Sequence, residues 1–162
     1  MSLLNFCEWL ADTPLSVWLR EAPYPYPVLL ITHVMTIGIF GGMAVLGNLR
    51  VLGRALRSVP VSQVLAQFRP WKWAAGLLLL VSGTLIALSD PLEYYENVMF
   101  WISNVVVIAA VVNAWVFSRG ALRDVAAWEN ASSASPAAIR WARTSLVLWI
   151  VLIFAGRAMA FF

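Results

Sequence analysis

Charge is scarce in this sequence, and so are the residues that build most catalytic and metal sites. Only 12% of the 162 residues are charged, against about 25% in soluble domains. The single cysteine, Cys7, excludes an internal disulfide, a CxxC redox pair and a CxxCH haem-attachment motif. No nucleophile–base pair, carboxylate pair, phosphate-binding loop or metalloprotease motif is present. The chain has one histidine, His33.

Long apolar runs take the place of charge. The chain is 62% hydrophobic, with a mean hydropathy of +0.81. Because a helix of roughly 20 apolar residues crosses the hydrocarbon core of a bilayer, each such run is a candidate span. Four runs qualify, at roughly 27–50, 71–89, 97–118 and 142–162. The sequence therefore predicts an all-α integral membrane protein, a single domain over residues 1–162 with four spans in an up-down-up-down bundle.

The first 22 residues are too short and too charged to span a membrane. Their apolar residues recur at helical spacing, which predicts amphipathic helices in the membrane interface, with a restart at Thr13-Pro14. Each proline between Pro23 and Pro27 disfavours the α region for the residue before it. We therefore expect an extended elbow here, and Pro27 as the first residue of the first span.

The links between the spans differ in charge. Residues 51–70 and 119–141 are basic, whereas residues 90–96 are acidic. The side with the two basic links carries nine of the eleven basic residues and two of the eight acids. By the positive-inside rule this side is cytoplasmic, which predicts a bacterial inner-membrane protein with both termini in the periplasm. The net charge of +3 thus reflects topology, and we expect the lipid bilayer, not nucleic acid, as partner.

Polar residues within the spans lie at similar depths. They are His33, Ser82, Thr84, Ser103, Asn104 and Arg157. At 1.5 Å per residue, all fall about 8–10 Å below the predicted outer surface. Ionisable groups in lipid usually face the bundle interior and pair, so we expect one polar layer with Arg157 beside His33. No acid lies inside a span, which argues against a carboxylate-driven transporter.

His33 has four interpretations that the sequence leaves open. It is a neutral histidine hydrogen-bonded across helices, or a proton relay. It is an axial ligand of haem b, with Arg157 on a propionate and the sixth position held by Met35, Met99, another subunit or nothing. It is a copper ligand together with soft methionines such as Met99 and Met159. Arg157 alternatively extends its side chain to the nearby interface.

Small residues and amides mark expected helix contacts. Four glycines form a small-residue face on span 1: Gly38, Gly41, Gly42 and Gly47. Another helix or a flat macrocycle could lie close to such a face. Together with the small size of the chain, it favours a homo-oligomer or membership of a larger membrane complex. Near the inner end, Asn48 and Asn113 are expected to hydrogen-bond to each other.

Three stretches carry a resemblance to known families. They read HVMTIGIFGGMAVLGNLRVLG (33–53), PWKWAAGLLLLVSGTLIALSDPLEYYEN (70–97) and AGRAMAFF (155–162). Over nearly the whole chain they resemble a family of four-span bacterial membrane proteins without an established activity. The histidine, glycine pair and basic residue of span 1 are more distantly similar to copper-resistance D-type proteins and to haem-containing membrane protoporphyrinogen oxidase. That resemblance implies a haem or copper role for His33.

The resemblance departs from the wider group at one place. Those proteins often carry a lysine near the start of span 3, where this chain reads Phe100-Trp101-Ile102-Ser103, which argues against oxidase chemistry. Our preferred hypothesis is a b-type haem protein for electron transfer, with His33 as axial ligand and the cofactor surrounded by Arg157, Ser103, Asn104 and Thr84. The alternatives are a copper-handling protein using His33, Met35 and Met99, and a cofactor-free accessory or structural subunit.

Overall fold

The computed structural model describes residues 2–123, 125–129, 134–159 and 161. In this part of the chain every regular element is a helix: α1 (Leu3–Ala11), α2 (Pro14–Glu21), α3 (Pro25–Val51), α4 (Val61–Ser89), α5 (Pro91–Glu96), α6 (Val98–Arg119), α7 (Val125–Trp128) and α8 (Pro136–Ala158). Four of these, α3, α4, α6 and α8, are long and apolar enough to cross a membrane. The predicted all-α fold with four membrane-crossing helices is therefore confirmed.

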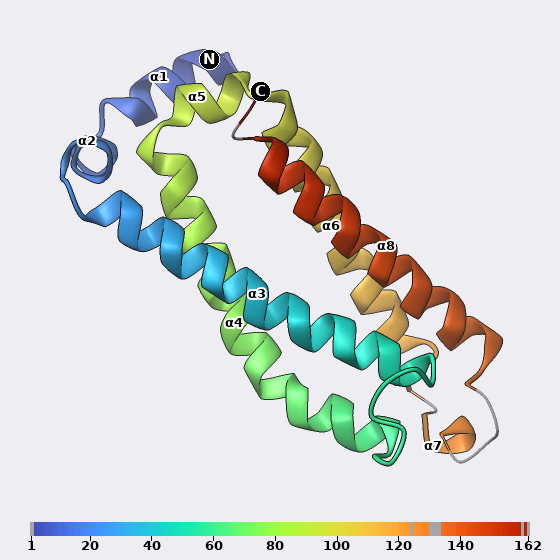
Figure 1. Cartoon of the computed structure of the whole chain (residues 1–162). Coiled ribbons are helices and arrows are strands. Elements are labelled where there is room, and N and C mark those ends of the chain that lie inside the picture. Colours follow the sequence, from blue (N-terminus) through green and yellow to red (C-terminus); the bar gives the residue numbers. More distant parts are fainter. Residues whose placement is uncertain (1, 124, 130–133, 160, 162) are drawn as a thin grey trace.

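The four long helices form two hairpins (Figure 1). Helix α3 packs along α4, helix α6 packs along α8, and the two members of each pair run in opposite directions. Among these four helices, α3 and α8 make the contact that joins the hairpins. Both termini lie at one end of the molecule, beside α1, α2 and α5, and α7 lies at the other. We call these the terminal end and the α7 end.

Helix α3 ends in a Schellman motif. Gly53 adopts a φ of +66°, a left-handed conformation that glycine takes without steric cost. The Arg54 N–H donates to Leu49 O at 2.8 Å, and the Gly53 N–H donates to Arg50 O at 3.0 Å. These two bonds satisfy carbonyls that the helix end would otherwise leave unpaired. The chain is thereby turned out of α3 and returns as α4.

Helix α4 is longer than the sequence indicated. The link predicted at residues 51–70 is wrong over its second half, because α4 begins at Val61 and includes Pro70. The added turns pack into a buried cluster at the α7 end, made of Val51, Val61, Phe117, Ala138 and Ala142. Helix α8 likewise begins at Pro136 instead of residue 142. Burial of the added turns of α4 outweighs the loss of the hydrogen bond that Pro70 removes. Both α4 and α8 begin before the apolar segments from which the spans were predicted.

The proline-rich elbow is shorter than predicted. Helix α3 already begins at Pro25, and Tyr24 before it has a φ of −110° and a ψ of −33°, in the helical region. Extended backbone is found at Ala22, whose ψ is 139°. The prediction failed because Pro25 and Pro27 lie in the first turn, where backbone N–H groups have no helical partner in any case.

The short helices at the terminal end carry side-chain caps. Thr13 accepts a hydrogen bond from the Ser16 N–H at 3.4 Å, so the predicted helix restart is confirmed. Asp90 accepts from the Glu93 N–H at 3.2 Å and begins α5, in the segment 90–96 that the sequence indicated only as an acidic link. Helix α1 packs on α5, and α2 packs on α4, so these short helices cover the terminal end of the first hairpin.

Glu129 ties the residues after α7 to the start of α4. The Ser62 N–H, in the first turn of α4, donates to Glu129 Oε2 at 3.0 Å. A carboxylate is favourable there, because the first N–H groups of a helix are unpaired and the helix dipole is positive at its N-terminus. Hydrogen bonding from Ser62, with a smaller effect of the Arg50 charge, holds the pKa of Glu129 below its usual range.

We expect Glu129→Gln to lower the unfolding temperature at about pH 7, because glutamine keeps the acceptor and loses the charge. The folded pKa lies below the unfolded value of about 4.3, so the stabilisation is complete above the unfolded value and is lost as pH falls through the folded one. Thermal unfolding in detergent should thus show a gap between wild type and variant that narrows as the pH falls below the unfolded pKa of about 4.3. A gap that stays constant through this range would contradict the assignment.

Candidate functional site

His33 on α3 is joined to α4 by a hydrogen bond. Its Nδ1 lies 2.8 Å from Ser82 Oγ. The serine hydroxyl has one proton and donates it to Leu78 O at 2.6 Å, so its oxygen accepts from His33 Nδ1. In the neutral ring the proton is therefore on Nδ1, and Nε2 presents a lone pair. A ring nitrogen in this state is able to accept a hydrogen bond or to bind a metal.

Gly83 makes room for the His33 ring. A Cβ added at Gly83 would lie 3.1 Å from His33 Cε1, closer than ordinary contact distance. The ring is half-buried, whereas Ser82 is 1% exposed. Sequence reasoning missed Gly83, although a glycine next to a serine inside an apolar helix is a recognisable signal of close approach.

Arg157 lies at the terminal end of α8 and is exposed. Its guanidinium carbon is 4.7 Å from the centre of the Phe161 ring, a cation–π arrangement. Among the described residues, His33 hydrogen-bonds to Ser82, whereas the Arg157 guanidinium contacts the Phe161 ring. The expected pairing of Arg157 with His33 is thus not among the contacts of the described residues.

The other residues of the predicted polar layer point in different directions. Ser103 on α6 is buried, and its Oγ has no hydrogen-bond partner in the described part of the chain. Thr84 and Asn104 are exposed, and each donates to the carbonyl four residues earlier in its own helix, at 2.8 Å. Of the layer, Ser82 is the member that meets His33. Depth along a helix is predictable from sequence, but the face is not.

The methionines predicted as metal ligands lie on different parts of the fold. Met35 is 63% exposed on α3, Met99 is half-buried on α6, and Met159 follows α8. Across residues 2–123, 125–129, 134–159 and 161, no group of three or more His, Cys, Asp or Glu side chains could hold a metal ion. These residues therefore give no support to a metal site built from His, Cys, Asp and Glu side chains alone.

Amide side chains contact α8 toward the α7 end, one from the other hairpin and one from within the same hairpin. Asn48 donates to Ser145 Oγ at 2.8 Å, and Asn113 Nδ2 lies 3.5 Å from Trp141 O. The expected hydrogen bond between the two asparagines is not formed, because each reaches α8 instead. Such polar contacts hold helices together in a bilayer, where apolar burial contributes little.

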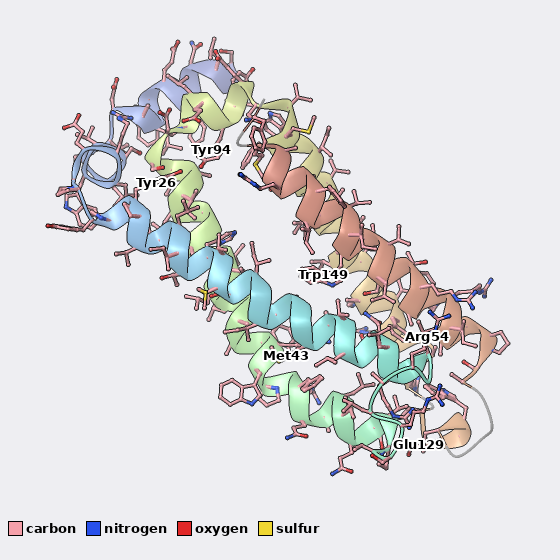
Figure 2. All side chains as sticks on the ribbon, in the orientation of Figure 1. Tyr26, Met43, Arg54, Tyr94, Glu129 and Trp149 are labelled. Atoms are coloured by element: carbon pink, nitrogen blue, oxygen red, sulfur yellow. The ribbon has the colours of Figure 1, made fainter. Side chains whose placement is uncertain are left out.

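The glycines of α3 serve helix packing at two positions. A Cβ at Gly41 would meet the Trp149 ring of α8 at 3.3 Å, and one at Gly47 would meet Leu65 at 3.6 Å. A Cβ added at Gly38 or at Gly42 would have no neighbouring atom within 4 Å in the described part of the chain. Trp149 lies on the side of α8 that faces α3 (Figure 2).

A second polar site lies at the terminal end and was not anticipated. It is a pocket of about 250 Å³ lined by Arg20, Tyr26, Ser89, Asp90, Glu93 and Tyr94. These residues come from α2, α3, α4 and α5 and the capping position between the last two. From the sequence the charges indicate only topology, and nothing in the spacing of these residues predicts that they converge.

The four apolar helices define the class of this protein as a multi-pass membrane protein. Within that class, the chain belongs to DUF6644, a family of unknown function that it matches over residues 28–162. The match includes all four long helices and leaves out α1 and α2. No curated protein and no solved structure matches the chain.

Proposed function

We propose that this protein binds a b-type haem inside the membrane, with His33 as axial ligand, and that it serves electron transfer. The observation that supports this is the chain of hydrogen bonds from His33 Nδ1 through Ser82 to Leu78 O. Metal-binding histidines commonly donate their second ring N–H to a fixed acceptor, which sets the tautomer and orients the ring. Ser82 does this for His33 and leaves Nε2 free for iron.

The single histidine fits haem better than a bare metal ion. The porphyrin supplies four nitrogens, so haem iron needs only one protein ligand. Copper would need further protein ligands. Met35 is 63% exposed, and no group of three or more His, Cys, Asp or Glu side chains in the described residues could hold a metal ion. The Arg157 guanidinium, exposed on α8, suits a haem propionate. The sixth position would be open, or held by Met99 or by a second copy of the chain.

We also propose that the protein lies in a bacterial inner membrane with its termini in the periplasm. Nine of the eleven basic residues lie toward the α7 end, and six of the eight acids belong to the terminal end. This asymmetry supports a cytoplasmic α7 end. Trp9 and Trp18, which are 63% and 56% exposed, support an interfacial position for α1 and α2.

A UV–visible spectrum of the full chain, purified from cells supplied with haem, tests the haem proposal. We expect a Soret band in the wild type and its loss in His33→Ala, because the iron would lose its protein ligand. Val34→Ala is the matched control, since Val34 neighbours His33 and is 56% exposed.

The wild type without a Soret band, or an equal band in His33→Ala, would reject the proposal. In that case the cofactor-free interpretation holds, with His33 and Ser82 joining two helices of an accessory subunit. Co-purification would then identify the larger complex or the second copy to which the spans bind.

A further inference from the structure

The pocket at the terminal end has the size of a small polar group. Its volume is about 250 Å³, below the roughly 300–1,000 Å³ of pockets for drug-sized ligands. A haem is too large for it, so the pocket is separate from the site proposed for His33. Figure 2 shows Tyr26 of α3 and Tyr94 of α5 close together at this end of the molecule.

The pocket contains both signs of charge without an internal ion pair. Arg20 of α2 contributes the cation, and Asp90 and Glu93 contribute two carboxylates. In the described part of the chain, Arg20 makes a long hydrogen bond of 3.5 Å to Ser89 O and no salt bridge with either acid. The three charges are therefore available to a ligand that carries a negative and a positive group together.

Two phenols complete the wall of the pocket. Tyr26 Oη lies 3.4 Å from Tyr94 Oη, and both rings are half-buried. Burial, together with the hydrogen bond to Tyr26, raises the pKa of Tyr94, which stays a neutral phenol at physiological pH. The two hydroxyls thus offer hydrogen bonds without adding charge.

The position of the pocket is that of a lipid headgroup. It lies where α3 begins and α4 ends, at the limit of two membrane-crossing helices. In the turns of α3 that follow Tyr26, Val28, Leu30 and Ile31 are 59%, 41% and 63% exposed, so this part of the helix offers apolar side chains to acyl chains. Tyrosine is itself enriched at this depth of a bilayer.

We propose that this pocket binds a phosphoethanolamine group, supplied by the headgroup of a phosphatidylethanolamine lipid. Arg20 binds the phosphate, for which a guanidinium is well suited. Asp90 and Glu93 bind the ammonium, and the tyrosine hydroxyls hydrogen-bond to the phosphate oxygens. This site goes beyond the proposed haem function and does not depend on it, because none of its residues contacts His33 in the described part of the chain.

Native mass spectrometry of the full chain in detergent tests the lipid site. Phosphatidylethanolamine and phosphatidylglycerol with identical acyl chains are added in equal amounts. We expect the wild type to retain the ethanolamine lipid about five-fold more, since one exposed charge pair contributes up to about 1 kcal/mol. Asp90→Asn should weaken this preference, because it removes a carboxylate that binds the ammonium, while asparagine keeps the oxygen that caps α5. Arg20→Gln should lower the retention of both lipids, because both carry the phosphate that Arg20 binds.

Two control variants separate binding from folding. Glu96→Gln removes an acid from the same helix, α5, outside the pocket, and should keep the preference. Arg20→Lys keeps the cation and should retain most of the binding of both lipids. Equal retention of the two lipids by the wild type would overturn the proposal, and so would an unchanged preference in Asp90→Asn or unchanged retention of both lipids in Arg20→Gln.

Competition with soluble phosphoethanolamine distinguishes the source of the group. If the soluble compound displaces the lipid, the headgroup alone is the ligand and the proposed chemistry stands. If the lipid stays bound and the preference still depends on Asp90, the site is specific for a membrane lipid.

Discussion

Leucine in place of Gly41 should destabilise the protein by about 1–3 kcal/mol, the usual cost of overfilling a packed contact. Gly41 is buried on α3, and a Cβ there would already lie 3.3 Å from Trp149 Cζ3. The remaining carbons of leucine would have to enter the space of the indole ring. Trp149 is 8% exposed and also packs on Phe40, with ring centres 5.6 Å apart, so it has little room to move.

This contact matters because it lies between the hairpins. Among the four long helices, α3 and α8 make the contact that joins the two pairs. In lipid, the solvent is as apolar as the side chains, so helix association depends on close packing and hydrogen bonds rather than on apolar burial. Loss of the Gly41–Trp149 fit would therefore leave the Asn48–Ser145 hydrogen bond as a main remaining link between α3 and α8.

Thermal unfolding in detergent, followed by tryptophan fluorescence, measures the effect. Gly42→Leu is the matched control, because a Cβ at Gly42 has nothing within 4 Å. There leucine should be neutral or stabilising by up to about 1 kcal/mol, since it favours the helix more than glycine does. Equal losses in the two variants would show that the fit between Gly41 and Trp149 does not hold the hairpins together.

Ser82→Ala should lower haem affinity about 10- to 100-fold, the range for loss of a residue that orients a metal ligand. Without the hydroxyl, His33 Nδ1 loses its acceptor at 2.8 Å, and neither the tautomer nor the ring orientation is held. This prediction rests on the proposed function. Titration of the haem-free protein with haem, followed at the Soret band, gives the dissociation constants.

Thr84→Ala is the control for the Ser82 variant. It removes a hydroxyl from the same helix, but Thr84 is exposed and bonds only to its own helix at Leu80 O. Its haem affinity should equal that of the wild type. If Ser82→Ala also binds haem as tightly as the wild type, the tautomer argument for His33 fails, even where His33→Ala abolishes binding.

Much of the fold follows from the sequence, and the failures are local. The second half of the link at residues 51–70 is helical, because Val61, at 2% exposure, packs in a buried cluster with Phe117 and Ala138 of the second hairpin. Nothing in the local sequence signals that partner. Pro25 and Pro27 start a helix where a local rule predicts extended backbone, because a first helical turn needs none of the N–H groups that proline lacks.

For the candidate site, too, the sequence predicted one part and missed another. The sequence indicated that His33 and Ser82 lie at one depth, and the structure joins them at 2.8 Å. It indicated equal roles for Thr84 and Asn104, which are exposed. Ser82 and Thr84 are two residues apart, a rotation of about 200° around a helix at 100° per residue. Depth depends on residue number alone, whereas the face presented to a neighbour depends on how the whole helix is rotated.

By itself, the sequence determined that this chain crosses a membrane with four helices and where most of them end, because the thickness of the hydrocarbon core requires long uncharged segments. It also determined the charge asymmetry between the two ends. Only the tertiary structure decided that Ser82 is the partner of His33, that Gly41 receives Trp149, and that charges distant in sequence converge around Tyr26 and Tyr94. These contacts depend on which helices are neighbours and on their rotation, and the packing of the whole chain sets both.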